Sequence, residues 1–313
     1  MMLPPEIRRK LARLNVSRQP PAASSQQSDA SGADSSQFTV DSSPSGDASH
    51  IATSGVEHPG ARRLEDILPG RVHEHEGGRL YVVERRVETL YPAGKEKIAA
   101  AVQEVRQLGR EPEEAVFLDV ETCGLANCPL FLVGILSVRE TETGEGEAPA
   151  EPAREDPRPP GMHVRIEQYF ARDYTEEASL LAYLAEVISA YRMLITFNGR
   201  TFDIPYMRDR MTFHRLEYEF EHEHFDLLFE ARRLWRDKLP DCRLQTLEEH
   251  IVGRRRFGDT PGHLIPQLYH DFVRTGNAAL IEGVFHHNAL DLITMAELLP
   301  VVTRRRGDAA MGR

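Results

Sequence analysis

The chain has 313 residues, of which 41% are hydrophobic and 28% are charged, proportions typical of a soluble globular protein. At roughly 100 to 200 residues per domain, this length predicts one large domain or two smaller ones. The 49 Asp and Glu residues outnumber the 38 Lys and Arg residues, and the net charge of -11 excludes a uniformly basic nucleic-acid coat protein but not a local basic groove. Three cysteines are too few for a disulfide framework, and no stretch approaches the roughly 18 apolar residues of a membrane span. We therefore expect a cytoplasmic protein.

Residues 1–59 do not have the composition of a packed domain. Residues 1–19 place Ile7, Leu11 and Leu14 at helical spacing among basic residues, which predicts a short amphipathic helix. Because this helix has few apolar residues, we expect it to contact a protein partner rather than a membrane. Residues 20–59 are mainly Ser, Ala, Gln, Gly and Asp, and cannot bury enough apolar surface to offset their ordering entropy, so we predict a disordered linker.

A small lead-in subdomain is predicted over residues 60–112. It contains a turn signal in its Leu-Glu-Asp-Ile-Leu-Pro-Gly stretch, hairpin character around 77–91 and a helical pattern over 95–108. We expect this subdomain to pack on the domain that follows.

The main domain is predicted over residues 113–300, followed by a basic tail at 301–313. Three apolar runs, an amphipathic helix and a fourth strand favour an α/β fold with a mixed sheet, before a helical half. These elements are expected at 116–122, 131–138, 163–170, 176–191 and 193–197. The acidic, Pro-rich and Gly-rich segment 140–160 predicts a flexible insert, and 218–225 is the candidate fifth strand.

Two acids interrupt the first strand of the main domain. Strand alternation points Asp119 and Glu121 to the same face, about 7 Å apart at Cα. Burying two like charges is costly unless a divalent cation or hydrogen-bond donors neutralise them. The pair is therefore a candidate ligand pair for a hard metal ion, and a solvated pair at a strand end is the alternative.

Further acids and a histidine follow in two later segments. Asn198 and a glycine end the fourth strand, and Asp203 falls in the first turn of the next helix, where an acid also compensates the helix dipole. His287 and Asp291 are at positions i and i+4 and share one helical face. Each feature alone also fits a structural role, which is helix capping for Asp203 and a surface pair for His287 and Asp291.

In chain order, these segments read Asp-x-Glu, Asn-x-x-x-Phe-Asp and His-Asn-x-x-Asp. This pattern resembles the DEDD 3′-to-5′ exonuclease superfamily, and most closely its YprB-like family of ribonuclease H-like proteins. The resemblance covers about residues 115–300 and includes the stretches Phe225-Asp-Leu-Leu and Gly262-His-Leu-Ile-Pro. It implies a ribonuclease H-like α/β fold with a central mixed five-stranded sheet flanked by helices.

The resemblance also implies a metal centre and a general base. Two Mg²⁺ or Mn²⁺ ions would be held by Asp119, Glu121, Asp203 and Asp291. Such an ion pair lowers the pKa of a water molecule and stabilises the leaving oxygen of a phosphodiester. The superfamily places its base four or five residues before the last acid, and this chain has a histidine at both positions. His287 is the expected base and His286 is the alternative.

Contacts to the substrate backbone are predicted at one asparagine and four arginines, because an acidic protein needs a local basic rim to bind phosphates. These residues are Asn198, Arg232, Arg233, Arg254 and Arg255, and Arg256 extends the same basic run. The alternatives are that the asparagine stabilises its own turn and that the arginines lie on solvated surfaces.

Taken together, the motifs favour a metal-dependent 3′-to-5′ exonuclease acting on single-stranded DNA or RNA with a free 3′ end. One alternative is a catalytically weak nucleic-acid-binding or scaffold module on the same fold, although the complete set of acids argues against it. The other is a ribonuclease H-like endonuclease, which a substrate without a free end would distinguish.

Overall fold

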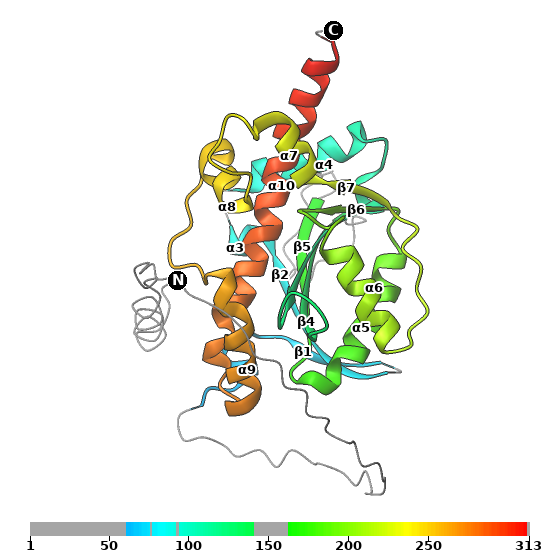
Figure 1. Cartoon of the computed structure of the whole chain (residues 1–313), viewed down its shortest axis with the longest axis vertical. Helices are drawn as coiled ribbons and strands as arrows, with labels where there is room; N and C mark the ends of the chain where they lie inside the picture. The colour runs from blue at the N-terminus through cyan, green and yellow to red at the C-terminus, as the bar shows by residue number, and fades with distance from the viewer. Residues whose placement is uncertain (1–60, 76, 92–93, 141–161, 312–313) are drawn as a thin grey trace, which may run out of the picture. The chain divides into compact units, whose positions relative to one another are not determined.

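The structure, a computed structural model, describes residues 61–75, 77–91, 94–140 and 162–311 (Figure 1). The predictions of an amphipathic helix and a disordered linker within residues 1–59 lie outside the described residues. So does most of the predicted insert at 140–160.

A seven-stranded sheet forms the centre of the fold, with the strand order β1-β2-β5-β4-β3-β6-β7. The strands are β1 (Arg71–His75), β2 (Gly78–Arg86), β3 (Ala115–Thr122), β4 (Leu130–Glu140), β5 (Met162–Phe170), β6 (Met193–Thr196) and β7 (Glu223–Asp226). The β3, β6 and β7 strands run parallel, and all other neighbours are antiparallel. The predicted mixed sheet is confirmed, but the predicted number of five strands is wrong.

The two additional strands, β1 and β2, form a hairpin in the segment that was predicted to be a lead-in subdomain. In β2, the four residues Leu80–Val83 are all buried, so this strand is covered on both faces. It pairs antiparallel with β5 from Tyr81 to Arg86 and so covers the backbone edge that β5 would otherwise expose. The sequence predicted a hairpin around 77–91, whereas its strands lie at 71–75 and 78–86, and no local signal indicates the sheet that it joins, which explains the wrong count.

The predicted fifth strand is shorter than its apolar pattern suggested. Of residues 218–225, only the last three pair with the sheet, in β7. Tyr218, Phe220 and His222 are half-buried in an irregular segment that leads to β7. Their alternation therefore arises from packing on neighbouring helices and not from strand pairing.

Helices cover both faces of the sheet. They are α2 (Leu64–Ile67), α3 (Val87–Leu90), α4 (Lys95–Gln107), α5 (Glu177–Ser189), α6 (Asp203–Phe213), α7 (Leu227–Trp235), α8 (Leu244–Leu247), α9 (Ile265–Thr275) and α10 (Glu282–Met311). Short helical turns are η2 (Pro112–Glu114), η3 (Tyr174–Glu176), the π-helical η4 (Glu248–Val252), η5 (Gly262–Leu264) and η6 (Ala278–Leu280). As Figure 1 shows, α5 and α6 lie on one side of the sheet and α10 crosses the other.

Strand alternation in β3 decides which face carries the acids. Leu118 and Val120 belong to the apolar core that includes Leu180 of α5, whereas Phe117 belongs to the core that includes α10. Asp119 and Glu121 share the face of Phe117, so both carboxylates point toward α10.

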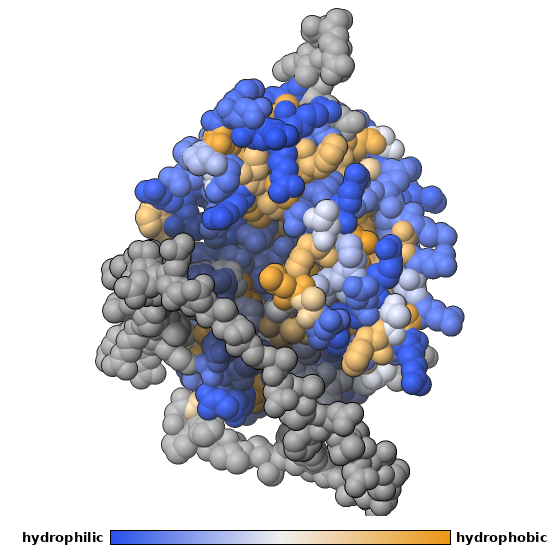
Figure 2. Space-filling view, viewed as in Figure 1, coloured by the Kyte–Doolittle hydropathy of each residue, from blue (hydrophilic) through white to orange (hydrophobic). Residues whose placement is uncertain are grey.

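The last helix is longer than the sequence indicated. It has 30 residues and continues through Pro300, so residues 301–311 of the predicted basic tail belong to it. Within the described ranges, no helix is both long and apolar enough to cross a membrane. The face of the molecule seen in Figure 2 is mostly hydrophilic, with scattered apolar patches. The cytoplasmic location stays a prediction.

Candidate active site

The site is built where α10 lies closest to the sheet. Asp119, Gly134 and Gln168 are register partners in one row across β3, β4 and β5. Asn288 of α10 lies over Gly134, where an added Cβ would be 2.0 Å from the Asn288 Oδ1 atom, so only glycine fits. The Asn288 amide donates to Asp119 Oδ2 at 2.8 Å, and its Oδ1 accepts from Gln168 Nε2 at 2.9 Å. The packing of Asn288 on Gly134 and its two hydrogen bonds fix the distance between α10 and the β3 acids Asp119 and Glu121.

The turn after β6 supplies the third acid. Asn198 has a φ of 70°, and a Cβ on Gly199 would lie 2.2 Å from Thr196 Oγ1, so the chain can turn tightly into α6. Asp226 Oδ1 accepts the Asn198 backbone N–H at 3.0 Å and caps α7, which fixes the turn. The turn therefore places Asp203, which is 4% exposed, at the start of α6.

The fourth acid and the histidine come from one face of α10. His287 Nε2 lies 3.5 Å from Asp291 Oδ2, four residues further along the helix. Both ring nitrogens are engaged, because His287 Nδ1 lies 3.0 Å from both oxygens of Asp259. The predicted proximity of His287 to Asp291 is thus present in the structure.

The acids from β3, α6 and α10 act on one another electrostatically. Burial raises the pKa of Asp119 well above its ordinary value, and the charges of Asp291, Glu121 and Asp203 raise it further. Burial and the charges of Asp291 and Asp203 also raise the pKa of Glu121 strongly. The pKa of Asp203 rises to about 7, chiefly through burial, although backbone hydrogen bonds from Val120 and from its own N–H oppose the rise. Three motifs far apart in sequence therefore form one acidic cluster.

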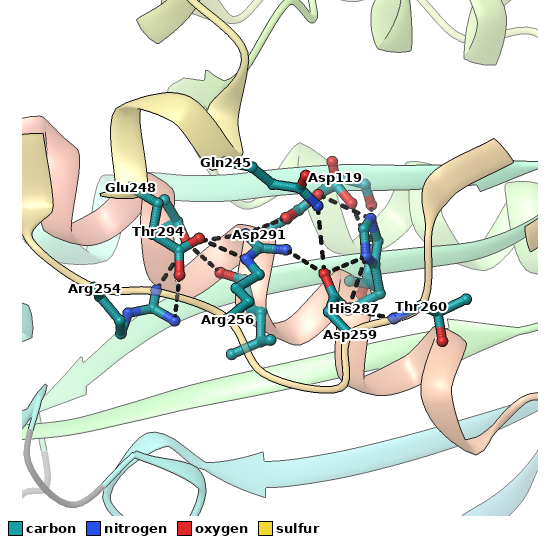
Figure 3. A network of polar contacts seen from close by, with 12 residues as sticks. Asp119, Gln245, Glu248, Arg254, Arg256, Asp259, Thr260, His287, Asp291 and Thr294 are labelled. Carbon is teal, nitrogen blue, oxygen red and sulfur yellow. Dashed lines mark hydrogen bonds and ion pairs between the residues drawn. The ribbon is translucent and has the colours of Figure 1, made fainter. Parts of the chain in front are cut away.

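A loop over residues 253–261, here called the arginine loop, closes the other side of the cluster (Figure 3). Arg256 is largely buried, and its guanidinium lies 2.5 Å from Asp291 Oδ1, 2.5 Å from Glu248 Oε2 and 3.1 Å from Asp259 Oδ2. The network in Figure 3 extends to Arg254 and Thr294. The positive charge of Arg256 thus compensates the negative charges of Asp291, Glu248 and Asp259.

The chemistry of these acids suits a hard divalent cation, although their positions do not yet form a coordination sphere. In the part of the chain that the structure describes, no three Asp, Glu, His or Cys side chains are arranged to hold a metal ion. Two of the four carboxylates are held by other partners, Asp291 by Arg256 and Asp119 by Asn288. Carboxylate oxygens are the ligands that Mg²⁺ and Mn²⁺ prefer, and a cation would relieve the mutual repulsion that raises the pKa values. The donor set therefore fits the implied ions.

The residues predicted to contact nucleic acid do not form one surface patch. Asn198 Oδ1 accepts from Thr201 Oγ1 at 2.6 Å, so its side chain stabilises its own turn. Arg254 is bound to Glu248 and Glu297, with a side chain only 14% exposed.

The other predicted arginines are exposed, namely Arg232, Arg233 and Arg255. Arg255 lines a cleft of about 380 Å³ that lies between the arginine loop and the segment containing Gln245 and Glu248. Of the two histidines, His287 contacts Asp259 and Asp291, whereas burial lowers the pKa of His286.

Comparison with known proteins agrees with this architecture. Residues 160–303 match the family model described as the RNase_H superfamily. The chain is 34% identical over 196 residues to "Uncharacterized protein YprB" of Bacillus subtilis (strain 168), a match that covers 61% of this chain and 42% of that protein. Residues 160–303 are therefore similar to the ribonuclease H superfamily. The predicted resemblance to YprB is confirmed, and this ribonuclease H-like chain spans less than half the length of that relative.

A more distant likeness concerns a solved structure. The family B DNA polymerase from the hyperthermophilic archaeon Pyrobaculum calidifontis is 12% identical, with a TM-score of 0.41 over 59% of this chain and 24% of the polymerase chain.

Three residues of the site were not predicted in the roles that the structure gives them. Asp259 belongs to none of the predicted motifs, and Arg256 was considered only as part of a basic rim. Asn288 is part of the His-Asn-x-x-Asp motif, but no role was predicted for it. The available signal for Asn288 is its position one residue after His287 and three before Asp291, which places it on the same side of the helix. Asp259 and Arg256 reach the acidic cluster because of the conformation of the arginine loop, which no local sequence pattern predicts.

Proposed function

We propose that this ribonuclease H-like chain is a metal-dependent nuclease of the DEDD type that shortens single-stranded DNA or RNA from a free 3′ end. The observation that carries the proposal is that acids from β3, α6 and α10 form one cluster, in which burial and neighbouring charges raise the pKa values of Asp119, Glu121 and Asp203. A structural role alone does not account for this, because burying several like charges destabilises a fold.

The proposed metal ligands are Asp119, Glu121, Asp203 and Asp291. When two Mg²⁺ or Mn²⁺ ions are bound, they supply activation of water and stabilisation of the leaving 3′ oxygen. The protein contributes the fixed geometry, because Asn288 orients the Asp119 carboxylate and Asp226 fixes the turn before Asp203.

The proposed general base is His287. Its Nε2 atom faces Asp291 at 3.5 Å, which places the ring at the edge of the acidic cluster. Burial alone would lower the pKa of His287, but its hydrogen bond to Asp259 and the charges of Asp291 and Asp259 raise it above the ordinary value. A neutral ring in this position accepts a proton from the attacking water through Nε2.

Substrate phosphates are proposed to contact the exposed arginines Arg232, Arg233 and Arg255. Arg255 pairs with Glu249 but its side chain is 69% exposed, and the cleft that it lines is also lined by Arg256 and Asp259. Arg254 is not proposed as a phosphate contact, since its side chain is only 14% exposed and its guanidinium is bound to the buried Glu248 and Glu297.

The test is digestion of 5′-labelled single-stranded DNA and RNA, each with a free or a blocked 3′ end, in Mn²⁺ or in EDTA. We expect a Mn²⁺-dependent ladder that shortens from the free 3′ end, and its loss in Asp119→Asn. Asp271→Asn is the matched control, because Asp271 is also buried but lies on α9 and pairs with Arg274.

Other outcomes would contradict the proposal in distinct ways. Cleavage of a circular substrate would indicate an endonuclease. Binding of single strands without cleavage, by a folded protein that also binds Mn²⁺, would indicate a binding module.

A further inference from the structure

The arginine loop places one carboxylate directly behind the histidine of the site. Both oxygens of Asp259 lie 3.0 Å from His287 Nδ1, on the side of the ring away from Asp291. His287 and Asp259 are 28 residues apart in sequence. Figure 3 shows the two side chains directed toward each other, Asp259 from the loop and His287 from α10.

The charge state of Asp259 determines which nitrogen of the ring carries the proton. Burial by itself would raise the pKa of Asp259, but the hydrogen bond with His287 and the charges of His287 and Arg256 together lower it. An ionised carboxylate accepts hydrogen bonds and cannot donate one. Nδ1 of His287 must therefore be the donor, so a neutral ring has its lone pair on Nε2, the atom that faces Asp291.

Asp259 is itself held in place from three directions. Arg256 Nη1 donates to Asp259 Oδ2 at 3.1 Å, the Thr260 backbone N–H donates to Oδ1 at 2.8 Å, and Gln245 Nε2 lies 3.5 Å from Oδ2. Gly253 and Gly258 have φ values of 78° and 71°, a conformation that glycine adopts without strain and that lets the loop turn back toward α10. The carboxylate therefore has little freedom to leave the ring.

We propose that Asp259 is a positioning residue that fixes His287 in the Nδ1-protonated tautomer, with Nε2 directed at the reacting water. The inference deepens the proposed nuclease function and rests on it. Asp259 acts only through His287, so it affects the orientation and protonation of the ring and not the binding of nucleic acid. A carboxylate behind a histidine commonly has this role where the opposite nitrogen does the chemistry.

The alternative is that Asp259 only attaches the arginine loop through Arg256. The two roles predict different tautomers of the neutral His287 ring when the Asp259 carboxylate is replaced by an amide. If Asp259 only attaches the loop, the ring tautomer has no reason to change in Asp259→Asn, which is nearly the same size. If Asp259 fixes the tautomer, the amide can present either an acceptor or a donor to Nδ1, and the single tautomer is lost.

The first measurement is nitrogen NMR of the full chain labelled at its histidines, without metal and at about pH 9, where the imidazole is neutral. The His287 signals are assigned by their disappearance in His287→Gln. We expect a protonated Nδ1 and an unprotonated Nε2 in the wild type, and an Nε2-protonated population in Asp259→Asn. A wild-type ring protonated on Nε2, or an unchanged ring in the variant, would overturn the proposal.

The second measurement is steady-state hydrolysis with the single-stranded substrate. In Asp259→Asn we expect kcat to fall by about 10- to 100-fold with KM changed less than about 2-fold, because the variant affects the proton acceptor and not substrate binding. Asp259→Glu keeps a carboxylate and should recover part of kcat. An unchanged kcat, or a loss that appears only in KM, would refute the positioning role.

Asp271→Asn is the matched control for both measurements. Asp259 and Asp271 each pair with an arginine three residues away in sequence, and the side chain of each is 9% exposed. Asp271→Asn should leave the His287 tautomer and kcat unchanged. If the wild type hydrolyses nothing, the proposed function fails, while the NMR measurement still decides whether Asp259 fixes the ring.

Discussion

Replacing Arg256 with methionine removes the guanidinium of the arginine loop that contacts both Asp259 and Asp291. Its side chain is 6% exposed and contacts Glu248, Asp259 and Asp291 at 2.5, 3.1 and 2.5 Å. Removing one partner of a buried ion pair typically costs about 3 to 5 kcal/mol, because the other charge stays buried without compensation. Arg256→Met keeps most of the side-chain volume, so a loss in the free energy of unfolding would result from removal of the charge and not from a cavity.

In Arg256→Met the acids Glu248, Asp259 and Asp291 keep other partners, and this limits the expected loss in the free energy of unfolding. Arg254 also contacts Glu248 at 2.8 Å, and His287 contacts both Asp259 and Asp291. We therefore expect the lower end of the range, a loss of about 3 kcal/mol in the free energy of unfolding.

Urea unfolding in EDTA at neutral pH, followed by circular dichroism, measures this loss. Arg274→Met is the control, because Arg274, like Arg256, pairs with an Asp three residues away in sequence, but its side chain is 67% exposed. Such an exposed pair contributes less than about 1 kcal/mol. A loss below about 1 kcal/mol for Arg256→Met would refute the view that its guanidinium compensates the buried acids. Addition of Mn²⁺ should restore part of the stability of Arg256→Met, since the ion would bind the carboxylates that the arginine leaves.

Two further predictions concern the sheet and the acidic cluster. Gly134→Ala should lower the free energy of unfolding by about 1 to 3 kcal/mol, because its Cβ would clash with Asn288; urea unfolding measures the loss, and an unchanged midpoint would contradict the close packing. The pKa of Asp203 is raised to about 7, so the folded state binds a proton more tightly than the unfolded state and stability falls as pH rises from about 4 to 7. In EDTA this group contributes a decline of up to about 4 kcal/mol, which Asp203→Asn should remove; identical pH profiles for the variant and the wild type would refute it.

The parts of the site that the sequence predicts are those encoded by short-range geometry. Asp119 and Glu121 follow from strand alternation, and His287 and Asp291 from helical spacing. Their convergence could be expected only through the family resemblance, since no local rule brings β3 next to α10.

What the sequence does not predict depends on tertiary packing. A hairpin was expected in this part of the chain, although a few residues later than the observed β1-β2 pair, and its pairing with β5 adds two strands to the expected sheet. Arg254 and Arg256 are neighbours in one basic run with Arg255, yet the loop turns these two toward buried acids and leaves Arg255 exposed. Charge patterns alone therefore overestimate the basic surface.

The site has a rigid part and a part that depends on a loop. His287, Asn288 and Asp291 all belong to α10, whose buried residues pack in the core with β3, β6 and α7. Displacing this helix would disrupt the core, so these residues keep their spacing as long as the domain is folded. Asp259 and Arg256 belong to the arginine loop, and they set the tautomer of His287 and the charge balance of Asp291. A shift of the loop would therefore change the histidine and one carboxylate while leaving Asp119 and Asp203 in place, so Asp259 variants should lose turnover before they lose the acidic cluster.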